Sequence, residues 1–533
     1  MPQTGAQLLV QRLKELGVDT LFSLSGNQIM PVYDACIDAG LDIIHVRHES
    51  GAVFMADAFA QMTGKLGVAM VTAGPGFGNA ISPVFSAQMN ESPILLLSGD
   101  SPVGLDGLGA FQELDQCSMI APVVKSTERP KSPTELCQAF DRAVVTALSG
   151  RMGPTHISLA FDVLNQEAES PTKQQSVPSK ELSRADALYV ADAINAANKP
   201  IIFTGPMLNE GRGKEELAAL REAFAVPVIN LESPRGLRDP SLGTFVKLMK
   251  EADLVVSLGK ELNFTTGFMK APTLSDDVKV IAIDPDAETL KKTRERIGSK
   301  LQTSIEADPK PAARALAALG DNYHRNQDWS MDVEIATSNR KVAALPADQF
   351  HSKALAEALK AKLDKIDNLI LVCDGGEIGQ WVQGFCPTTY RIINGMSGAI
   401  GGAIPYALGA KVANPDATVV ALMGDGTAGF HFPELDTAAR AKLAFVGIVG
   451  NDDKWNAEVE IQKRDYGPNR VFACELSADA RYDLGAVAFG CEGALANSVE
   501  EFNTAFDAAL EADRPYLINA RIEGYAAPVY LDE

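Results

Sequence analysis

The chain has 533 residues, of which 46% are hydrophobic and 22% are charged, so it can bury several cores and is too long for one domain of ordinary size. Its 48 Lys and Arg residues are outnumbered by 69 Asp and Glu residues, which gives a formal net charge of -21. Because this charge repels phosphate backbones and anionic lipid surfaces, we expect neither nucleic-acid binding nor membrane binding. No apolar run is long enough to cross a bilayer.

The seven cysteines are odd in number, scattered, and never in a Cys-x-x-Cys pair. This usage is typical of reduced thiols in a protein core, and it predicts a cytoplasmic protein. Near the amino terminus, apolar residues recur at positions 6, 9, 10, 13 and 16, with Thr4 as a helix cap and Gly17 as the stop. This spacing predicts an amphipathic helix rather than a signal peptide.

The first predicted domain, residues 1–165, alternates short apolar runs with helical patterns. Alternation of this kind predicts a parallel sheet covered by helices on both faces. The expected strands are 18–24, 42–46, 68–73 and 94–98, and the expected helices lie near 28–39, 51–63 and 77–89.

Two further domains of the same class follow. The polar stretch 166–184 is predicted to be a linker, and residues 186–321 form a middle domain that resembles nucleotide-binding units. A second polar passage covers 322–347. Residues 348–533 form the last domain. The middle domain has expected strands at 200–204, 226–230, 254–258 and 278–284. The predicted fold class is therefore α/β, with three doubly wound parallel-sheet domains.

Two polar clusters follow neighbouring apolar runs in the last domain. Gly-Asp-Gly at 424–426 ends the run 417–423, and Asn-Asp-Asp at 451–453 follows the run 444–449, with one helical segment that contains Glu434 between them. A strand-helix-strand unit brings both clusters together at the carboxyl edge of a parallel sheet. There, two acids can share a divalent cation and glycine amides can face a phosphate. A lone Gly-Asp-Gly is usually a turn, so the prediction depends on the strand context and the second cluster.

The two clusters and their spacing resemble the cofactor-anchoring motif of thiamine diphosphate enzymes. Supporting stretches are His-Glu-Ser-Gly at 48–51, Thr-Ala-Gly-Pro-Gly-Phe-Gly-Asn at 72–79, Gly-Ala-Phe-Gln-Glu-Leu-Asp-Gln at 109–116 and Gly-Ala-Ile-Gly-Gly-Ala-Ile-Pro at 398–405. Over essentially the whole chain, the arrangement resembles the branch with acetolactate synthases, benzaldehyde lyase, 2-hydroxyacyl-CoA lyases and oxalyl-CoA decarboxylases. The resemblance implies that the first domain binds the aminopyrimidine and the last binds the diphosphate.

Three residues match positions that act directly on the cofactor in this family. The resemblance implies that Glu49 hydrogen-bonds the pyrimidine nitrogen N1′ and shares its proton, so that N4′ can remove the proton from the thiazolium C2. Ile400 matches the bulky residue that bends the cofactor and brings N4′ against C2. Gly398 matches the residue whose carbonyl receives N4′–H.

The resemblance also implies cofactor contacts from both ends of the chain. The implied residues are Ser25, Gly26, Thr72 and Asn79 in the first domain, and Gly376, Glu377, Ile378, Gly424, Gly426 and Thr427 in the last. At 376–378 the family's polar side chains are partly missing, so we expect contact through the backbone.

The implied Mg²⁺ site departs from the usual family pattern. Asp425 matches one ligand, Asp452 occupies the position where most relatives have asparagine, and the carbonyl of Lys454 matches the third. Aspartate is a suitable hard oxygen ligand, but it adds a negative charge beside the diphosphate. A shift of one residue would make Asn451 the ligand, and we favour Asp452.

Substrate contacts are implied by two short segments and one tryptophan. Gln112 matches a glutamine near the reacting carbonyl and could donate to an oxyanion, while Phe111 would form an apolar wall. Asn27 and Gln28 lie where relatives face the thiazolium, but benzaldehyde lyase has a histidine where this chain has Gln28, so acid-base transfer there is not expected. Trp455 either lines the pocket or packs against the sheet.

The first predicted function is a carboligase or decarboxylase that acts on a 2-oxo acid, similar to acetolactate synthase, because of Phe-Gln-Glu at 111–113. The alternative is a C–C lyase similar to 2-hydroxyacyl-CoA lyase or oxalyl-CoA decarboxylase, which the passage 258–264 resembles. A third possibility is an inactive cofactor-binding scaffold, and Glu49 argues against it.

The middle domain leaves its own ligand open. It has no Gly-x-Gly-x-x-Gly after a strand, so FAD or ADP is suggested only by Asp284 at a strand end. The two half-sites lie on different domains, and the family resemblance implies that they face one another across an isologous interface. We therefore expect a homodimer or homotetramer with active sites between chains.

Overall fold

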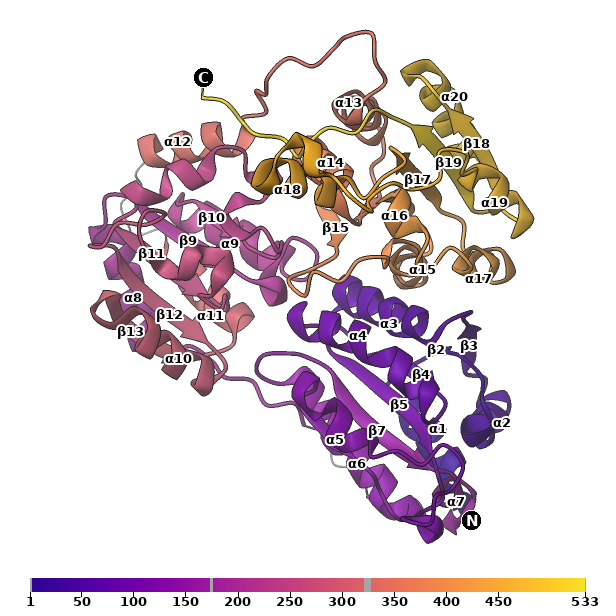
Figure 1. Ribbon diagram of the computed structural model, residues 1–533. Helices are drawn as coiled ribbons and strands as arrows, with labels where there is room; N and C mark the ends of the chain where they lie inside the picture. Colours follow the sequence, from indigo (N-terminus) through magenta and orange to yellow (C-terminus); the bar gives the residue numbers. More distant parts are fainter. Residues whose placement is uncertain (1, 173–175, 321–326, 533) are drawn as a thin grey trace.

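The computed structural model describes residues 2–172, 176–320 and 327–532, which form three α/β domains (Figure 1). Each domain is built on one parallel sheet, as predicted from the sequence. A separate antiparallel pair joins β1 (Gln3–Thr4) to β8 (Glu167–Ala168). Positions 173–175 of the predicted linker, 322–326 of the second polar passage and the predicted domain ends at 321 and 533 lie outside the described residues.

The first domain has a six-stranded sheet in the order β3-β2-β4-β5-β7-β6. Its strands are β2 (Thr20–Ser23), β3 (Asp42–His45), β4 (Gly67–Val71), β5 (Ile94–Asp100), β6 (Ser126–Glu128) and β7 (Thr155–Ala160). Its helices are α1 (Gly5–Glu15), α2 (Met30–Ala39), α3 (Glu49–Thr63), α4 (Pro75–Met89), α5 (Gln116–Ile120), α6 (Pro133–Leu148) and α7 (Phe161–Asn165). Helix α1 begins at Thr4, whose side chain caps it as expected.

The middle domain, magenta in Figure 1, has a five-stranded sheet in the order β10-β9-β11-β12-β13. Its strands are β9 (Pro200–Thr204), β10 (Val228–Asn230), β11 (Leu254–Leu258), β12 (Lys279–Asp284) and β13 (Leu301–Glu306). Its helices are α8 (Arg184–Ala196), α9 (Lys214–Phe224), α10 (Ala287–Ile297), α11 (Pro309–Ala317) and α12 (Gln327–Ser338).

The C-terminal domain has a second six-stranded sheet, in the order β15-β14-β16-β17-β19-β18. Its strands are β14 (Leu369–Cys373), β15 (Tyr390–Ile393), β16 (Thr418–Gly424), β17 (Val446–Asn451), β18 (Glu492–Ala496) and β19 (Tyr516–Arg521). Its helices are α13 (Ser352–Leu363), α14 (Gly376–Phe385), α15 (Ala403–Ala413), α16 (Asp425–Ala428), α17 (Glu434–Arg440), α18 (Asn456–Tyr466), α19 (Tyr482–Ala488) and α20 (Val499–Glu511).

One hydrophobic core is shared between the first and C-terminal domains, because α3 packs against α15 (Figure 1). Backbone atoms of Met55 lie where a side chain on Gly409 would be, so the two helices approach closely. At the same interface, the hydroxyl of Tyr406 donates to the buried carboxylate of Asp57 at 2.9 Å. This contact holds α3, the helix that begins at Glu49, against the C-terminal domain of the same chain.

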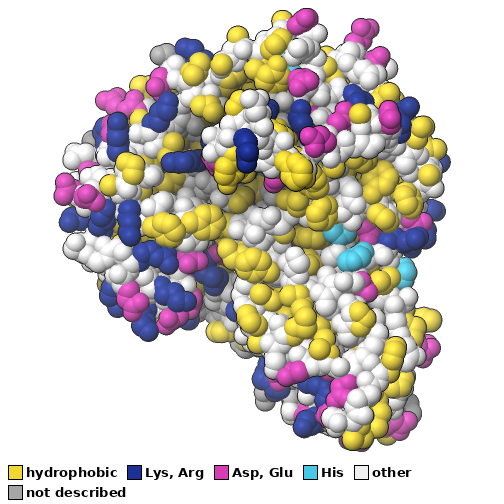
Figure 2. Space-filling model, in the orientation of Figure 1, with side chains coloured by type: hydrophobic (Ala, Val, Ile, Leu, Met, Phe, Trp, Pro, Cys, Tyr) yellow, Lys and Arg dark blue, Asp and Glu magenta, His cyan; other side chains and the backbone are white. Residues whose placement is uncertain are grey.

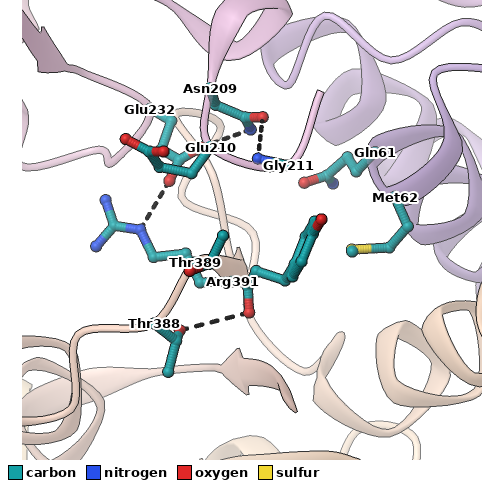
Figure 3. Close-up of a pocket in the computed structure, with 10 residues that line it drawn as sticks. Gln61, Met62, Asn209, Glu210, Gly211, Glu232, Thr388, Thr389 and Arg391 are labelled. Atoms are coloured by element: carbon teal, nitrogen blue, oxygen red, sulfur yellow. Dashed lines mark hydrogen bonds and ion pairs between the residues drawn. The ribbon is translucent and has the colours of Figure 1, made fainter. Parts of the chain in front are cut away.

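The three domains meet around a small pocket (Figure 3). Gln61 and Met62 come from α3, Asn209 and Glu232 come from the middle domain, and Arg391 comes from β15. The guanidinium of Arg391 donates to Glu232 at 2.7 Å and also pairs with Asp239 at 3.0 Å. These partly buried ion pairs tie the middle domain to the C-terminal domain.

Two polar passages contain more structure than the sequence predicts. Helix α12 lies inside the predicted passage 322–347, and Trp329 is buried in the middle-domain core with its indole N–H donating to the carbonyl of Pro200 at 2.9 Å. Strand β8 lies inside the predicted linker 166–184. Both segments therefore contain regular structure that their polar composition does not indicate, and in α12 the buried Trp329 anchors it.

Within the described ranges, the structure has no helix that combines the length and the apolar character needed to cross a membrane.

Candidate active site

The first half-site lies at the carboxyl edge of the first sheet, where β2, β3 and β4 end. Glu49 is the first residue of α3 and is 8% exposed. The side-chain amide of Asn79, from α4, donates to Glu49 Oε2 at 2.9 Å. A side chain on Gly76 would lie 3.1 Å from Glu49 Oε1 and 2.7 Å from Thr72 Cγ2, so the glycine avoids a tight contact with this carboxylate. The structure thus brings Glu49 and Asn79 together, with one carboxylate oxygen held by an amide.

Three polar side chains form a short relay beside this carboxylate. The hydroxyl of Thr72 donates to Gln28 Oε1 at 2.9 Å, and Gln28 Nε2 donates to Gln112 Oε1 at 2.8 Å. With its oxygen used as an acceptor, Gln112 keeps its N–H₂ group to donate elsewhere. Gly26 packs directly on Thr72, which leaves no space for a larger residue. The predicted residues Gly26, Gln28, Thr72 and Gln112 therefore form one cluster.

The loop that presents Gln112 is held by the next residue. The Glu113 carboxylate accepts from the backbone N–H groups of Gly107, Gly109 and Ala110, and these bonds lower the pKa of Glu113. Gln112 has a φ of 60° and lies against Gly74, whose own φ is 59°. Phe111 projects from this loop and is 77% exposed. Phe111 can therefore line a substrate pocket only if a surface from outside this domain packs against it.

Two predicted residues of the first half-site lie at its margin. Ser25 and Asn27 are exposed, and the Ser25 hydroxyl lies 3.1 Å from His45 Nε2. Asn27 starts a short 3₁₀ helix (Asn27–Ile29) and points to the surface, unlike its neighbour Gln28.

The second half-site is a pocket of about 70 Å³ at the carboxyl edge of the C-terminal sheet. All of its lining residues belong to the C-terminal domain: Gly376, Glu377, Ile378, Ile400, Gly424, Asp425, Gly426, Thr427, Gly450, Asp452, Lys454, Trp455, Asn456, Ala457 and Glu458. Complete small-molecule sites usually measure roughly 300–1000 Å³. The pocket is therefore sized for one end of a large cofactor.

The pocket lies at the amino ends of two helices, α14 and α18, whose first turns have no side-chain cap. Free backbone N–H groups at a helix amino terminus attract anions, and a diphosphate satisfies them. The hydroxyl of Thr427 donates to the carbonyl of Gly424 at 3.0 Å, so it shapes the turn in this geometry. The predicted diphosphate-binding segments 376–378 and 424–427 therefore share one cavity.

The charges around the pocket are mainly negative. Four of its lining side chains are acidic, Glu377, Asp425, Asp452 and Glu458, and only Lys454 is basic. Burial raises the pKa of Asp425 to about 6, and burial together with the nearby Asp425 carboxylate raises that of Asp452 to about 7. An anion would be repelled here without a cation, and two carboxylates are hard ligands of the kind Mg²⁺ prefers. The donor set therefore fits a bound divalent cation.

The expected metal ligands line the same pocket, whereas Asn451 lies outside it. The backbone N–H of Lys454 donates to Asp425 Oδ2 at 3.2 Å, and Asp452 and Lys454 both line the pocket. Asn451 is buried behind them, where its Nδ2 donates to Asn519 at 3.1 Å. Among the described residues, no group of three or more Asp, Glu, His or Cys side chains is placed to hold a metal ion. The expected site has only two such side chains, Asp425 and Asp452, and its third ligand is a backbone carbonyl.

The bent segment that carries Gly398 and Ile400 is fixed by Asp374. Asp374 Oδ2 accepts from the N–H groups of Gly401 at 2.7 Å and Ala403 at 3.1 Å, and burial raises the pKa of Asp374 to about 6. Ile400 lines the pocket, while Gly398 is exposed with a φ of 71°. Sequence reasoning did not identify Asp374, although its place directly after β14 matches that of other polar residues at strand ends.

Trp455 takes the first of the two roles that the sequence left open, lining the pocket. Its ring lies where a side chain on Gly426 would be, and it packs edge-on against Phe430 with ring centroids 6.3 Å apart.

The Glu377 carboxylate accepts from the backbone N–H of Ala527, so the C-terminal segment is tied to the pocket wall.

A hydrogen-bonded chain that the sequence analysis missed connects α3 to the C-terminal domain. The Ser50 hydroxyl lies 2.6 Å from His48 Nδ1 and 2.5 Å from His431 Nε2, and His431 Nδ1 lies 2.6 Å from the carbonyl of Gly401. Burial lowers the pKa of His431 to about 4. No pattern in the sequence pairs positions so far apart.

Exposed hydrophobic side chains flank both half-sites. Leu108 and Phe111 lie on the loop of the first domain, and Phe430 lies beside the C-terminal pocket. Figure 2 shows hydrophobic side chains gathered on the face in view, over the C-terminal domain and over the adjoining part of the first domain. Large exposed apolar side chains are typical of surfaces that contact another protein.

Comparisons with known proteins agree with this geometry. Residues 3–119 match "Thiamine pyrophosphate enzyme, N-terminal TPP binding domain", residues 189–316 match the central domain, and residues 374–520 match the C-terminal TPP binding domain. Thiamine pyrophosphate is another name for thiamine diphosphate.

Three relatives span most of the chain. A probable acetolactate synthase of Mycobacterium bovis is 29% identical, over 97% of this chain and 95% of the relative. An acetolactate synthase of the same organism is 30% identical, over 85% of this chain and 78% of the relative. A 2-hydroxyacyl-CoA lyase 2 of Bos taurus is 29% identical, over 93% of this chain and 86% of the relative.

The chain therefore belongs to the thiamine pyrophosphate enzyme family. It is a thiamine diphosphate-dependent enzyme that forms or cleaves carbon–carbon bonds, and its N-terminal and C-terminal domains are the two cofactor-binding domains.

Proposed function

We propose that this enzyme is a carboligase that acts on a 2-oxo acid, similar to acetolactate synthase. The observation that carries the proposal is the Thr72-Gln28-Gln112 relay, which uses the oxygen of Gln112 and so leaves its N–H₂ group as a neutral donor in the half-site that also holds Glu49. When bound, thiamine diphosphate supplies the nucleophilic carbon and the electron sink for chemistry next to a carbonyl. Gln112 then orients a carbonyl oxygen of the substrate, because its amide does not titrate and donates at any working pH.

Within this proposal, Glu49 holds and releases a proton at its carboxylate. Asn79 donates to Oε2, so Oε1 is the oxygen that remains for proton exchange with the cofactor. Ile400 supports the bend of the cofactor, and Asp374 positions the segment that carries it.

A second candidate is a 2-hydroxyacyl-CoA lyase, favoured by the relative of that name in Bos taurus. The two functions are separated by incubating the enzyme with pyruvate, glyoxylate, benzoylformate, oxalyl-CoA and formyl-CoA, each with and without aldehydes. We expect mass spectrometry to detect a 2-hydroxy-2-methyl-3-oxo acid from pyruvate. Turnover confined to the CoA thioesters would support the lyase, and no turnover together with no C2 proton exchange would support a scaffold.

We propose Mg²⁺ as the cation that joins the diphosphate to Asp425, Asp452 and the carbonyl of Lys454. The mainly acidic lining of the pocket supports this, since a diphosphate gains from a bridging cation there. Chelation of divalent ions should release the cofactor, as measured by calorimetry with and without added Mg²⁺.

We further propose that each active site combines Glu49 of one chain with the C-terminal pocket of another, in a homodimer or homotetramer. Two observations support this: the pocket is lined only from its own domain, and Phe111 is exposed on the loop that carries Gln112. A small-molecule substrate would then bind between the chains.

For the middle domain we propose a structural role without FAD or ADP. Asp284, the acid at the end of β12, is 3% exposed and pairs with Arg151 of the first domain, which also pairs with Glu91. A ribose would have to displace this buried ion pair, so Asp284 does not fit a nucleotide ligand in this arrangement. Heat denaturation followed by chromatography of the supernatant would test this, and released FAD or ADP would contradict the proposal.

We also propose a cytoplasmic location, as the seven free cysteines suggest. Fractionation of cells that express the chain would test it.

A further inference from the structure

Asn456 is a buried amide whose hydrogen-bonding capacity is unused. It is the first residue of α18 and is 7% exposed. Neither Oδ1 nor Nδ2 finds a hydrogen-bond partner within the part of the chain that the structure describes. A buried polar group without a partner destabilises a folded protein, so its presence calls for a ligand or water that completes it.

Asn456 belongs to the wall of the diphosphate pocket. Asn456 lines the cavity together with Asp452. A side-chain atom added to Gly524 would lie 1.8 Å from Asp452 Oδ2 and 2.7 Å from Asn456 Nδ2, so the carboxylate and the amide are close neighbours. The amide therefore lies beside a proposed metal ligand and at the uncapped amino end of an 11-residue helix.

Asn451 provides a contrast within the same strand-loop-helix unit. It ends β17 and is 2% exposed, but its Nδ2 donates to Asn519 at 3.1 Å and its Oδ1 accepts from the N–H of Asp453 at 3.3 Å. One buried asparagine is thus satisfied by the protein, whereas the other is not. Asn451 therefore has a structural role, whereas the hydrogen-bonding groups of Asn456 remain available to a ligand.

We propose that Asn456 is a further cofactor-binding residue, whose Nδ2 donates to an oxygen of the diphosphate and whose Oδ1 accepts from water bound to the cation. This rests on the proposed Mg²⁺ site. A neutral donor is favourable at this place because Asp425 and Asp452 both face the pocket, while the Lys454 ammonium lies 3.8 Å from Glu523. Asn456 attracts the diphosphate without competing for the carboxylates as a cation would.

The proposal predicts opposite effects of Asn456→Leu on the free protein and on cofactor binding. Leucine has nearly the same size and removes the unpaired donor and acceptor, so the melting temperature of the cofactor-free protein should rise. The Kd for thiamine diphosphate in saturating Mg²⁺, measured by isothermal titration calorimetry, should increase about tenfold, which corresponds to one lost hydrogen bond to a charged group. Asn456→Asp should weaken binding further, because it adds a charge that repels the diphosphate.

Two controls make the result specific. Asn451→Leu removes a satisfied amide and should lower the melting temperature of the cofactor-free protein. Lys463→Ala, on an exposed part of α18 that pairs with Glu460 at 2.8 Å, should leave the Kd unchanged. Thermal unfolding of all variants without cofactor shows whether each has folded.

The proposal is overturned if Asn456→Leu lowers the melting temperature and leaves the Kd unchanged, because the amide would then be structural. It is also overturned if the Kd rises equally for Lys463→Ala. The assay needs no substrate, so a wrong assignment of the carboligase reaction leaves its outcome intact. Wild-type protein that binds thiamine diphosphate equally well without Mg²⁺ would instead contradict the proposed cation site.

Discussion

The first and C-terminal domains share a strand order but differ in the chemistry at the edge of the sheet. In both, the first strand lies between the second and third, and the sixth lies between the fourth and fifth. In both, a glycine after the first strand packs on a threonine after the third: Gly26 on Thr72 in one, Gly375 on Thr427 in the other. These positions lie at the reversal of strand order, where ligands bind in open α/β sheets.

The residues around this shared glycine-threonine contact set the two domains apart. In the first domain it is surrounded by the amides of Gln28 and Gln112, with Glu49 nearby. In the C-terminal domain it lies beside Asp425 and the uncapped start of α14. One scaffold therefore supports an edge with amide side chains and one carboxyl group, and another edge with several carboxyl groups and free helix amino ends. The loops after the strands determine function, and the sheet determines only where they meet.

The largest expected effect comes from removing the proton-sharing group of the first domain. Glu49→Gln should lower kcat by about 10²- to 10⁴-fold, because an amide cannot exchange a proton with the cofactor. Cofactor binding, measured by calorimetry, should remain. Hydrogen–deuterium exchange at C2 gives a direct readout, and an unchanged rate would remove Glu49 from this role. Glu128→Gln, in a surface ion pair with Arg142, serves as the control.

The matching change in the C-terminal domain should remove binding instead of proton transfer. Asp425→Ala should weaken Mg²⁺-dependent cofactor binding by at least about 100-fold, whereas Asp452→Asn should retain it because asparagine keeps an oxygen ligand. If cofactor affinity falls in Asn451→Ala while Asp452→Ala binds normally, the ligand position is shifted by one residue.

The two defects should complement one another if the half-sites come from different chains. Equal mixing of Glu49→Gln and Asp425→Ala chains should restore about a quarter of wild-type activity, since half of the dimers are mixed and each has one intact site. Native mass spectrometry would establish chain exchange. Fully exchanged mixtures without activity would argue against a shared site.

Gly26 and Gly375 occupy matching positions, so the effect of a substitution on the free energy of unfolding can be compared between the two domains. Both Gly26→Ala and Gly375→Ala should crowd the facing threonine, but Gly375 also has a φ of 75°. We expect unfolding free energy to fall by about 3 kcal/mol for Gly375→Ala and by about 2 kcal/mol for Gly26→Ala. Chemical denaturation measures the difference, and equal losses would mean that the left-handed backbone at Gly375 carries no cost.

The smallest expected effect concerns pH at the contact between the two domains. Because burial lowers the pKa of His431 to about 4 from about 6.5 in the unfolded chain, its contribution is present above pH 6.5 and is lost as pH falls towards 4. Wild-type stability should lose about 2 kcal/mol between pH 7 and pH 5 from this group. His431→Gln should flatten this part of the profile, and an unaltered slope would contradict the assignment.

The sequence was most informative where short-range patterns determine structure. Strands β9 and β11 begin and end at the predicted residues, because each is a short apolar run between turn residues. Strands β6, β7 and β13 were missed, since β6 and β13 are half-buried and polar, and β7 contains the buried histidine His156. Helix α12 was missed because its sequence is polar outside a few core positions such as Trp329.

In the candidate site, the motif residues that follow strands could be placed from sequence, because a parallel sheet brings strand ends to one edge. Asp425 and Asp452 line one pocket, and Gln28 contacts Gln112 across 84 positions of sequence. The bond between Ser50 and His431 could not be predicted, since it depends on how two domains pack. The unused amide of Asn456 was likewise hidden, because hydrogen-bond satisfaction is a property of the folded surroundings.

The packing of α3 on α15 also bears on how the chain is made. Most residues of α3 are buried, yet α15 begins about 340 residues later in the sequence. At typical synthesis rates of about 5–20 residues per second, α15 is synthesised about 20–70 seconds after α3. During this interval the face of α3 that packs on α15 has no partner. During that time the nascent first domain exposes an alanine-rich helix that chaperones or neighbouring nascent chains can bind. Slow decoding after the first domain should therefore reduce the yield of soluble enzyme.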